Sequence, residues 1–154
     1  MLDAGLRVSE ACDLPWRQVN LADLTIRIRG KGSRDRIVPI TDITAAQLLR
    51  DHDERSPWTV PHLADPMQHL DRHYVGYVCR SLGREIGVRL HPHALRHTYA
   101  CACLRAGLTI YDVMRLLGHS SIETTAVYLH VQPDDLARRL REAMTPKAQL
   151  RLVM

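Results

Sequence analysis

The residue types that could do chemistry gather first in the segment HPHALRH, at positions 91–97. Pro92 suits the first position of a helix, because a backbone N–H would have no helical partner there. His93 and Arg96 then lie three residues apart on one helix face, near the positive end of the helix dipole. An imidazole and a guanidinium in this arrangement favour the binding of an anion.

The segment LLGHSSIETTAVYLH, at positions 116–130, is the second candidate. Gly118 is typical of a helix end, which places His119 in the following turn. Tyr128 comes nine residues after His119, in the next expected helix. A lone tyrosine on an apolar helix face is usually a core residue, so the interpretation of Tyr128 depends on the other segments.

Two further segments are GLRVSE at 5–10 and GKGSRDRIVPI at 30–40. With the first two segments they form a pattern that resembles the phage integrase family, also called the tyrosine recombinases, close to its Xer and integrase branch. The resemblance runs from residue 5 to about residue 131. A lone His-x-x-Arg is a weak signal, but these four segments carry five motifs, Arg, Lys, His-x-x-Arg, His and Tyr, whose order and compatible spacings make a strong one.

The resemblance implies a role for each polar position of these motifs. Arg7 and Arg96 would bind the scissile phosphate, and Tyr128 would be the nucleophile. The other positions would complete the pocket, namely Lys31 from a hairpin, His93, His119 and, as an acid that orients neighbouring groups, Glu10.

This set of side chains suits the cleavage of a DNA phosphodiester. Negative charge builds up on the phosphoryl oxygens during attack, and fixed guanidiniums stabilise it at any working pH. A tyrosine with an ordinary pKa of about 10 must lose its proton, which His93 could accept. Lys31 could protonate the leaving 5′ oxygen, and His119 could donate a hydrogen bond to a non-bridging oxygen. A covalent 3′-phosphotyrosine would store the bond energy, so rejoining would need no ATP, metal ion or other cofactor.

Other histidines near the motifs are expected to be structural. His91 stands where the family often has Ser or Thr as an N-cap, a departure that would weaken the helix start. His97 and His130 are expected to pack or to form structural hydrogen bonds. A zinc site formed by Cys101, Cys103 and nearby histidines is an alternative, but the spacing is unusual for structural zinc.

The elements that must position these residues are mainly helical. Apolar and polar residues alternate over 24–29, which predicts a strand with one solvent-exposed face. It would pair with residues 36–40 in a hairpin whose tip carries Lys31, and Pro39 predicts that the second strand lies at an edge. An irregular connection is expected at 56–66. Helical patterns fall at 4–14, 44–54, 68–83, 93–106, 109–117, 121–128 and 133–144.

Composition and charge are compatible with a folded protein that binds DNA. The formal net charge of +4 and the pI of about 9.1 favour a polyanionic partner. No apolar run approaches the ~18 to 20 residues needed to span a bilayer, and no signal peptide is evident. The cytoplasm is therefore the expected compartment, where the four cysteines would remain thiols.

The resemblance implies a catalytic domain at 1–145 and a C-terminal tail at 146–154, mainly α-helical with one small antiparallel hairpin sheet. The first helix of the usual catalytic domain and the N-terminal DNA-clamping domain are expected to be absent. Double-stranded DNA is the expected partner, bound by a tetramer of this chain or with a second recombinase, and the 133–144 helix would dock in cis or on a neighbour. Two alternatives are a non-catalytic DNA-binding or assembly remnant of a mobile element and a type IB topoisomerase.

Overall fold

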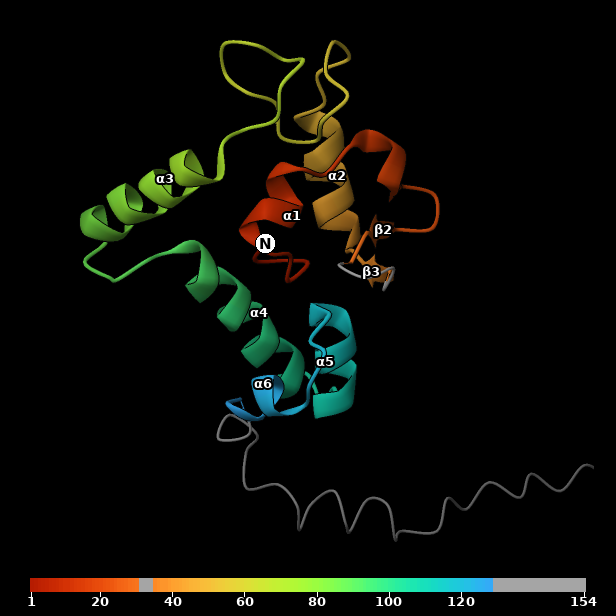
Figure 1. The fold of residues 1–154 in the computed structure, drawn as a ribbon, viewed down its shortest axis with the longest axis vertical. Coiled ribbons are helices and arrows are strands. Elements are labelled where there is room, and N and C mark those ends of the chain that lie inside the picture. Colours follow the sequence, from red (N-terminus) through yellow and green to blue (C-terminus); the bar gives the residue numbers. More distant parts are fainter. Residues whose placement is uncertain (31–34, 129–154) are drawn as a thin grey trace, which may run out of the picture.

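The computed structural model describes residues 1–30 and 35–128. Three sequence predictions lie outside these residues: Lys31, His130, and the helix and tail after residue 128. In the described part the fold is mainly helical with one small antiparallel sheet, so the predicted fold class is confirmed (Figure 1). The helices are α1 (Val8–Cys12), α2 (Asp42–Arg50), α3 (Arg72–Glu85), α4 (Pro92–Arg105), α5 (Ile110–Leu117) and α6 (Glu123–Ala126), with a 3₁₀ turn at Trp16–Gln18.

The sheet has three strands in the order β1 (Val19–Asn20), β2 (Thr25–Ile28) and β3 (Arg36–Pro39). The predicted β2–β3 hairpin is confirmed, with Ile26 opposite Val38 and with Pro39 in the edge strand β3. Strand β1 was not predicted, because two residues are too few to show an alternating pattern. The inward side chains of β2 and β3 form one hydrophobic cluster with Leu6 and Leu14.

The N-terminal helix is much shorter than predicted. The apolar spacing over 4–14 indicated one helix, but Gly5 has a positive φ of 60° and α1 begins only at Val8. Arg7 is the N-cap, and its backbone N–H donates to the Glu10 carboxylate across 2.7 Å. Ala4 and Leu6 are buried without being helical, so their spacing reflects packing against the core rather than a helix face.

Capping side chains explain where α2, α3 and α4 begin. Thr41 accepts from Thr44 at the start of α2, and Asp71 accepts from His73 and Tyr74 at the start of α3. Helix α3 therefore begins four residues later than predicted, at Arg72. His91 Nδ1 accepts from the backbone N–H of Ala94 across 3.1 Å, so α4 retains a side-chain cap despite the unusual residue.

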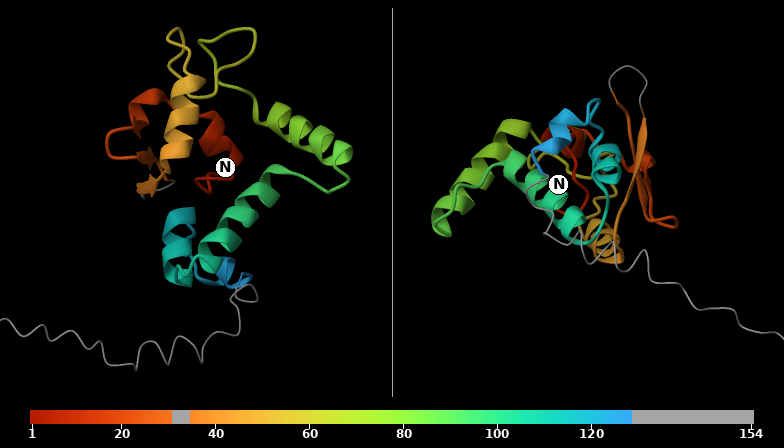
Figure 2. Two further views of the ribbon diagram at one scale, coloured as in Figure 1. Left: turned by 180° about the vertical axis from the view of Figure 1, so that it is seen from behind. Right: turned by 90° about the horizontal axis from the view of Figure 1, so that it is seen from below.

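Helices α4, α5 and α6 form a second part of the fold, beside α1, α2 and the sheet (Figures 1 and 2). Their core contains Ala100, Leu104, Val113, Leu117 and Tyr128. Helix α5 contacts strand β3, and α3 contacts both α1 and α4. The C-terminal end of α5 faces the start of β3, at the loop end of the hairpin, where Arg36 Nε donates to the Leu116 carbonyl. No helix in the described ranges is long and apolar enough to cross a membrane.

Candidate active site

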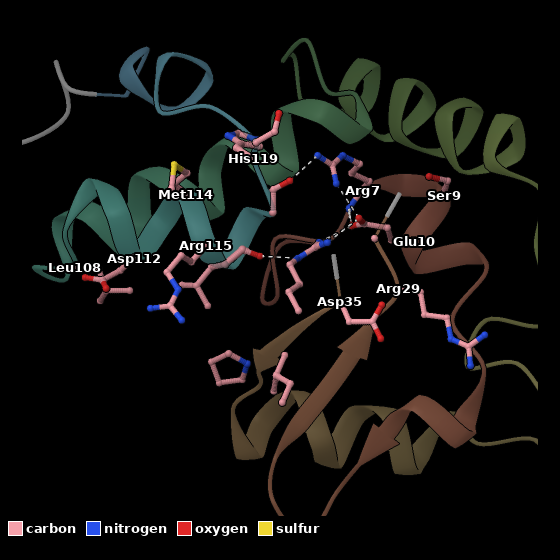
Figure 3. Close-up of a pocket in the computed structure, with 17 residues that line it drawn as sticks. Arg7, Ser9, Glu10, Arg29, Asp35, Leu108, Asp112, Met114, Arg115 and His119 are labelled. Carbon is pink, nitrogen blue, oxygen red and sulfur yellow. Dashed lines mark hydrogen bonds and ion pairs between the residues drawn. The ribbon is translucent and has the colours of Figure 1, made fainter. Parts of the chain in front are cut away.

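A cleft of about 1330 Å³ lies where α1, the β2–β3 hairpin and the end of α5 meet (Figure 3). Arg7 and Glu10 line it from α1, Arg36 from β3, and His119 from the turn after α5. Cationic side chains dominate this wall, which suits an anionic ligand.

Glu10 is the acidic centre of this cluster. One of its oxygens accepts from Arg7 Nη1 and from Arg36 Nη1, each across 2.9 Å. The other accepts from Arg36 Nη2 across 2.7 Å and lies 3.7 Å from Nη1 of Arg96. A single carboxylate thus holds three guanidiniums around it.

The same three arginines cap the C-terminal end of α5. Arg36 Nε donates to the Leu116 carbonyl across 2.9 Å, and Arg96 Nη2 donates to the Leu117 carbonyl across 2.6 Å. Arg7 Nη2 donates to the next carbonyl, that of Gly118, across 3.2 Å. Helix carbonyls at this end lack intrahelical donors and carry the negative end of the dipole, so cations are favourable there. Gly118 allows the sharp exit of the chain with a φ of 66°.

Charge and burial set the protonation of this cluster. Burial opposes ionisation of Glu10, but hydrogen bonds from Arg36 and Arg7 outweigh it and lower its pKa to about 2. Burial and the nearby Arg7 lower the pKa of Arg96 to about 10, so it remains charged at neutral pH. Arg96 is only 3% exposed and also donates to the Gly5 carbonyl across 2.7 Å. Three guanidiniums against one carboxylate leave an excess of positive charge, which an anion would balance.

His119 lies at the edge of this charge cluster. Its Nδ1 shares a hydrogen bond of 2.9 Å with the hydroxyl of Thr125, which is fully buried in α6. Burial and then the charges of Arg96 and Arg7 lower the pKa of His119 to about 4. The imidazole is therefore neutral at pH 7 and can donate one hydrogen bond without carrying charge.

Tyr128 lies in the core of the α4–α6 part and is 2% exposed. Its ring lies against His97, with 4.8 Å between the ring centroids. His97 in turn has its Nε2 3.6 Å from the Cys101 sulfur, so the structure gives His97 packing contacts. Burial raises the pKa of the Tyr128 phenol, and the positive charge of Arg96 partly offsets this effect.

Comparisons with known proteins identify the family. Residues 1–135 match the phage integrase family. The chain belongs to the phage integrase family. It is 35% identical over 145 residues to the tyrosine recombinase XerA of Thermococcus kodakarensis, covering 91% of this chain and 51% of that protein. It is 36% identical over 154 residues to the tyrosine recombinase XerC of Pelobacter propionicus, covering 97% of this chain and 51% of that protein.

Solved structures of the family share the fold. A crystal structure of XerA recombinase aligns with a TM-score of 0.75 at 28% identity, covering 95% of this chain and 56% of that chain. The catalytic domain of bacteriophage HP1 integrase aligns with a TM-score of 0.67 at 25% identity, covering 96% and 79%. XerH recombinase bound to difH substrate aligns with a TM-score of 0.72 at 23% identity, covering 92% and 42%. This chain thus corresponds to the catalytic domain of tyrosine recombinases, which are enzymes, and spans about half the length of the curated relatives it matches.

The structure places five of the six polar positions expected from the phage integrase motifs, and they lie in different settings. Arg7 and His119 line the cleft. Arg96 is buried and binds the Leu117 carbonyl, which precedes the Gly118 carbonyl that Arg7 binds. His93 is exposed in the first turn of α4 and stacks on His91, with 6.5 Å between the ring centroids. Neither His93 nor Tyr128 is among the described residues that line the cleft. Lys31 lies outside the described residues, but Gly30 and Asp35, which flank the undescribed segment, both line the cleft.

Arg36 is a member of the cluster that the sequence motifs did not single out. It shares the inward face of β3 with the buried Val38, and its side chain is only 10% exposed. A charged residue on the inward face of a strand is unusual. The sequence does not show which face this is, because both Ile37 and Val38 are apolar and only Val38 is buried. Among the described residues, no three His, Cys, Asp or Glu side chains come close enough to hold a metal ion. All four cysteines are free thiols.

Proposed function

We propose that this chain is the catalytic domain, residues 1–145, of an enzyme that performs site-specific DNA recombination through a covalent 3′-phosphotyrosine intermediate. The observation that supports it most strongly is the pair Arg7 and Arg96. Their guanidiniums are bound to the adjacent carbonyls of Gly118 and Leu117 at the end of one helix. We propose that one phosphate group contacts both guanidiniums, which requires the buried Arg96 side chain, 3% exposed, to become accessible when DNA binds.

The arginines keep donors for a phosphate. A guanidinium has five N–H donors, and the bonds described above use two on Arg7 and two on Arg96. The protein bonds fix the orientation of each fork before a ligand arrives. Donors that need no reorganisation stabilise the charge that develops during phosphoryl transfer.

The proposed reaction balances without a cofactor. The Tyr128 oxygen attacks the scissile phosphorus, a phosphorus–tyrosine bond forms, and the bond from phosphorus to the 5′ oxygen breaks. His93 accepts the phenol proton, and Lys31 gives a proton to the leaving 5′ oxygen. Attack of a second 5′ hydroxyl on the phosphotyrosine reverses these transfers and rejoins the DNA. His119, neutral at pH 7, donates a hydrogen bond to a non-bridging oxygen.

Tyr128 must reach the phosphate for this reaction to occur. Because its side chain is 2% exposed within the core of the α4–α6 part, we include in the proposal that DNA binding draws Tyr128 toward Arg96. The positive charge of Arg96 lowers the pKa of the Tyr128 phenol, which would favour loss of its proton as the two groups approach.

Double-stranded DNA is the proposed partner. XerH recombinase, which shares this fold, was solved bound to its difH substrate. We propose that this chain acts on DNA in a tetramer or with a second recombinase, and that the tail at 146–154 is not part of the catalytic domain. The chain spans about half the length of the curated relatives it matches, so its DNA partner and its assembly are part of the proposal.

Covalent capture tests the proposal. The 154-residue chain is incubated with a pool of nicked suicide duplexes that carry randomised core sequences, and adducts are separated on a denaturing gel. We expect a protein–DNA adduct that maps to Tyr128 and is absent from the Tyr128→Phe variant. An adduct that persists in Tyr128→Phe would remove Tyr128 as the nucleophile. Binding of the duplexes without any adduct would support a non-catalytic DNA-binding module, and relaxation of plasmid without a specific site would support a type IB topoisomerase.

A further inference from the structure

Arg36 joins three separate elements of the fold through one side chain. It begins strand β3, binds Glu10 of α1 through Nη1 and Nη2, and binds the Leu116 carbonyl of α5 through Nε. Both ends of this fork meet one carboxylate, at 2.9 and 2.7 Å, which is the strongest geometry for this ion pair. A side chain 10% exposed with three such bonds is held in one conformation.

The partners of Arg36 are the groups that orient the proposed phosphate ligands. Glu10, which Arg36 holds, also binds Arg7 Nη1, and it lies 3.7 Å from Arg96 Nη1. Arg36 also binds the Leu116 carbonyl. The next two carbonyls along the chain, of Leu117 and Gly118, bind Arg96 and Arg7, and His119 follows them. A change at Arg36 would therefore reach both arginines through Glu10 and the turn that carries His119 through α5.

Arg36 also lies at the loop end of the hairpin. It pairs with Ile28, the last residue of β2, in the sheet register. The ion pair with Glu10 thus ties the loop end of the β2–β3 pair to α1. Gly30 and Asp35, which continue from this pair, line the cleft.

We propose that Arg36 is a positioning residue. It fixes the orientation of the Glu10 carboxylate, and Glu10 in turn orients Arg7 and Arg96 for contact with phosphate. The guanidinium of Arg36 itself stays bound to the Glu10 carboxylate. This inference rests on the proposed phosphoryl-transfer function. It distinguishes Arg36 from Arg7, whose side chain is 46% exposed and lines the same cleft.

The Arg36→Lys variant tests this role, because lysine keeps the charge but cannot form the bidentate fork. Adduct formation is measured over a range of DNA concentrations, and folding is measured by urea unfolding. We expect the adduct rate at saturating DNA to fall by roughly tenfold or more, with the half-saturating DNA concentration changed by less than about threefold. NMR titration should show the pKa of Glu10 rising from about 2 toward its ordinary value.

Arg27→Lys is the matched control. Arg27 lies on the same hairpin and pairs with Asp35 at 3.2 Å, but its side chain is 68% exposed. We expect it to retain wild-type rate and affinity. A folded Arg36→Lys protein with the wild-type rate at saturating DNA overturns the proposal, as does an effect confined to the half-saturating concentration, which would make Arg36 a direct DNA contact.

Two further arms keep the outcome decisive. If Arg36→Lys does not fold, Glu10→Gln removes the charged partner of Arg36 and is measured in the same way, and a wild-type rate in that variant overturns the proposal.

If the wild-type chain forms no adduct, inorganic phosphate is titrated while the NMR signals of His119 are followed. We then expect phosphate to bind roughly tenfold more weakly to Arg36→Lys than to Arg27→Lys. Equal affinities, or a wild-type cleft that binds no phosphate, overturn the proposal.

Discussion

Arg96 donates a hydrogen bond of 2.6 Å to the Leu117 carbonyl, which anchors a buried cation at the negative end of helix α5. The second bond of Arg96, to the Gly5 carbonyl, spans 91 positions of the chain. The guanidinium therefore stabilises the contact between the N-terminal segment and α5 as well as the charge of the cleft. Its removal has consequences for both stability and activity.

Arg96→Ala should lower both of these properties. It leaves the Gly5 and Leu117 carbonyls without their donor in a buried region, so we expect the free energy of unfolding to fall by about 2 to 4 kcal/mol. Adduct formation should fall by roughly 100-fold or more. Urea unfolding and the covalent capture assay measure the two effects. A variant with unchanged stability would contradict the structural role, and one with unchanged adduct formation would remove Arg96 from the site.

Glu10 should make the stability of the protein depend on acid pH. Its pKa in the folded protein is about 2, against an ordinary value of 4.5. The carboxylate therefore contributes stability above about pH 4.5, and this contribution is lost as the pH falls toward 2. It amounts to about 3 kcal/mol for a side chain that is only 13% exposed. Urea unfolding of wild type and Glu10→Gln at several pH values should give two curves that converge at low pH, and parallel curves would contradict it.

His119 should titrate far below an ordinary histidine. Its pKa is lowered to about 4, so the unfolded chain binds a proton between pH 6.5 and 4 that the folded protein does not. This residue therefore lowers the free energy of unfolding as the pH falls through that window, and it costs nothing above pH 6.5. Bound phosphate should raise the pKa of His119, because the anion offsets the nearby guanidiniums. NMR titration with and without inorganic phosphate measures both values, and a pKa near 6.5 in the free protein would disprove the charge environment described above.

Gly118→Ala should disturb the arginine cluster, whereas Gly87→Ala should not. The two glycines have similar positive φ values, 66° and 70°, so the backbone strain from alanine is similar at both, about 1 kcal/mol. A Cβ at position 118 would lie 2.8 Å from Arg36 Nη1, whereas one at position 87 would meet no atom within 4 Å. We expect the alanine at 118 to cost more stability and to slow adduct formation. Equal effects of the two variants in urea unfolding would show that the Arg36 contact does not matter.

The sequence by itself determined the local structure wherever a pattern repeats along the chain. Alternation over 24–29, followed by a turn and a second strand pattern at 36–40, predicted the hairpin, and the stop at Gly118 predicted the end of α5. Order and spacing of the motifs identified the family, because they do not require knowledge of which residues touch. The same reasoning failed at α1, because the apolar spacing of Ala4 and Leu6 comes from core packing around a turn at Gly5.

Only the tertiary structure decided how the cluster is held. The bonds of Arg36 to Leu116, of Arg96 to Gly5 and of Arg7 to Gly118 join residues 80, 91 and 111 positions apart. Periodicity reports which face of an element is buried, but it carries no information about which carbonyl a buried guanidinium meets. For the same reason the motifs could not show the burial of Tyr128 against His97, since that contact depends on how α4 packs against the chain after α6.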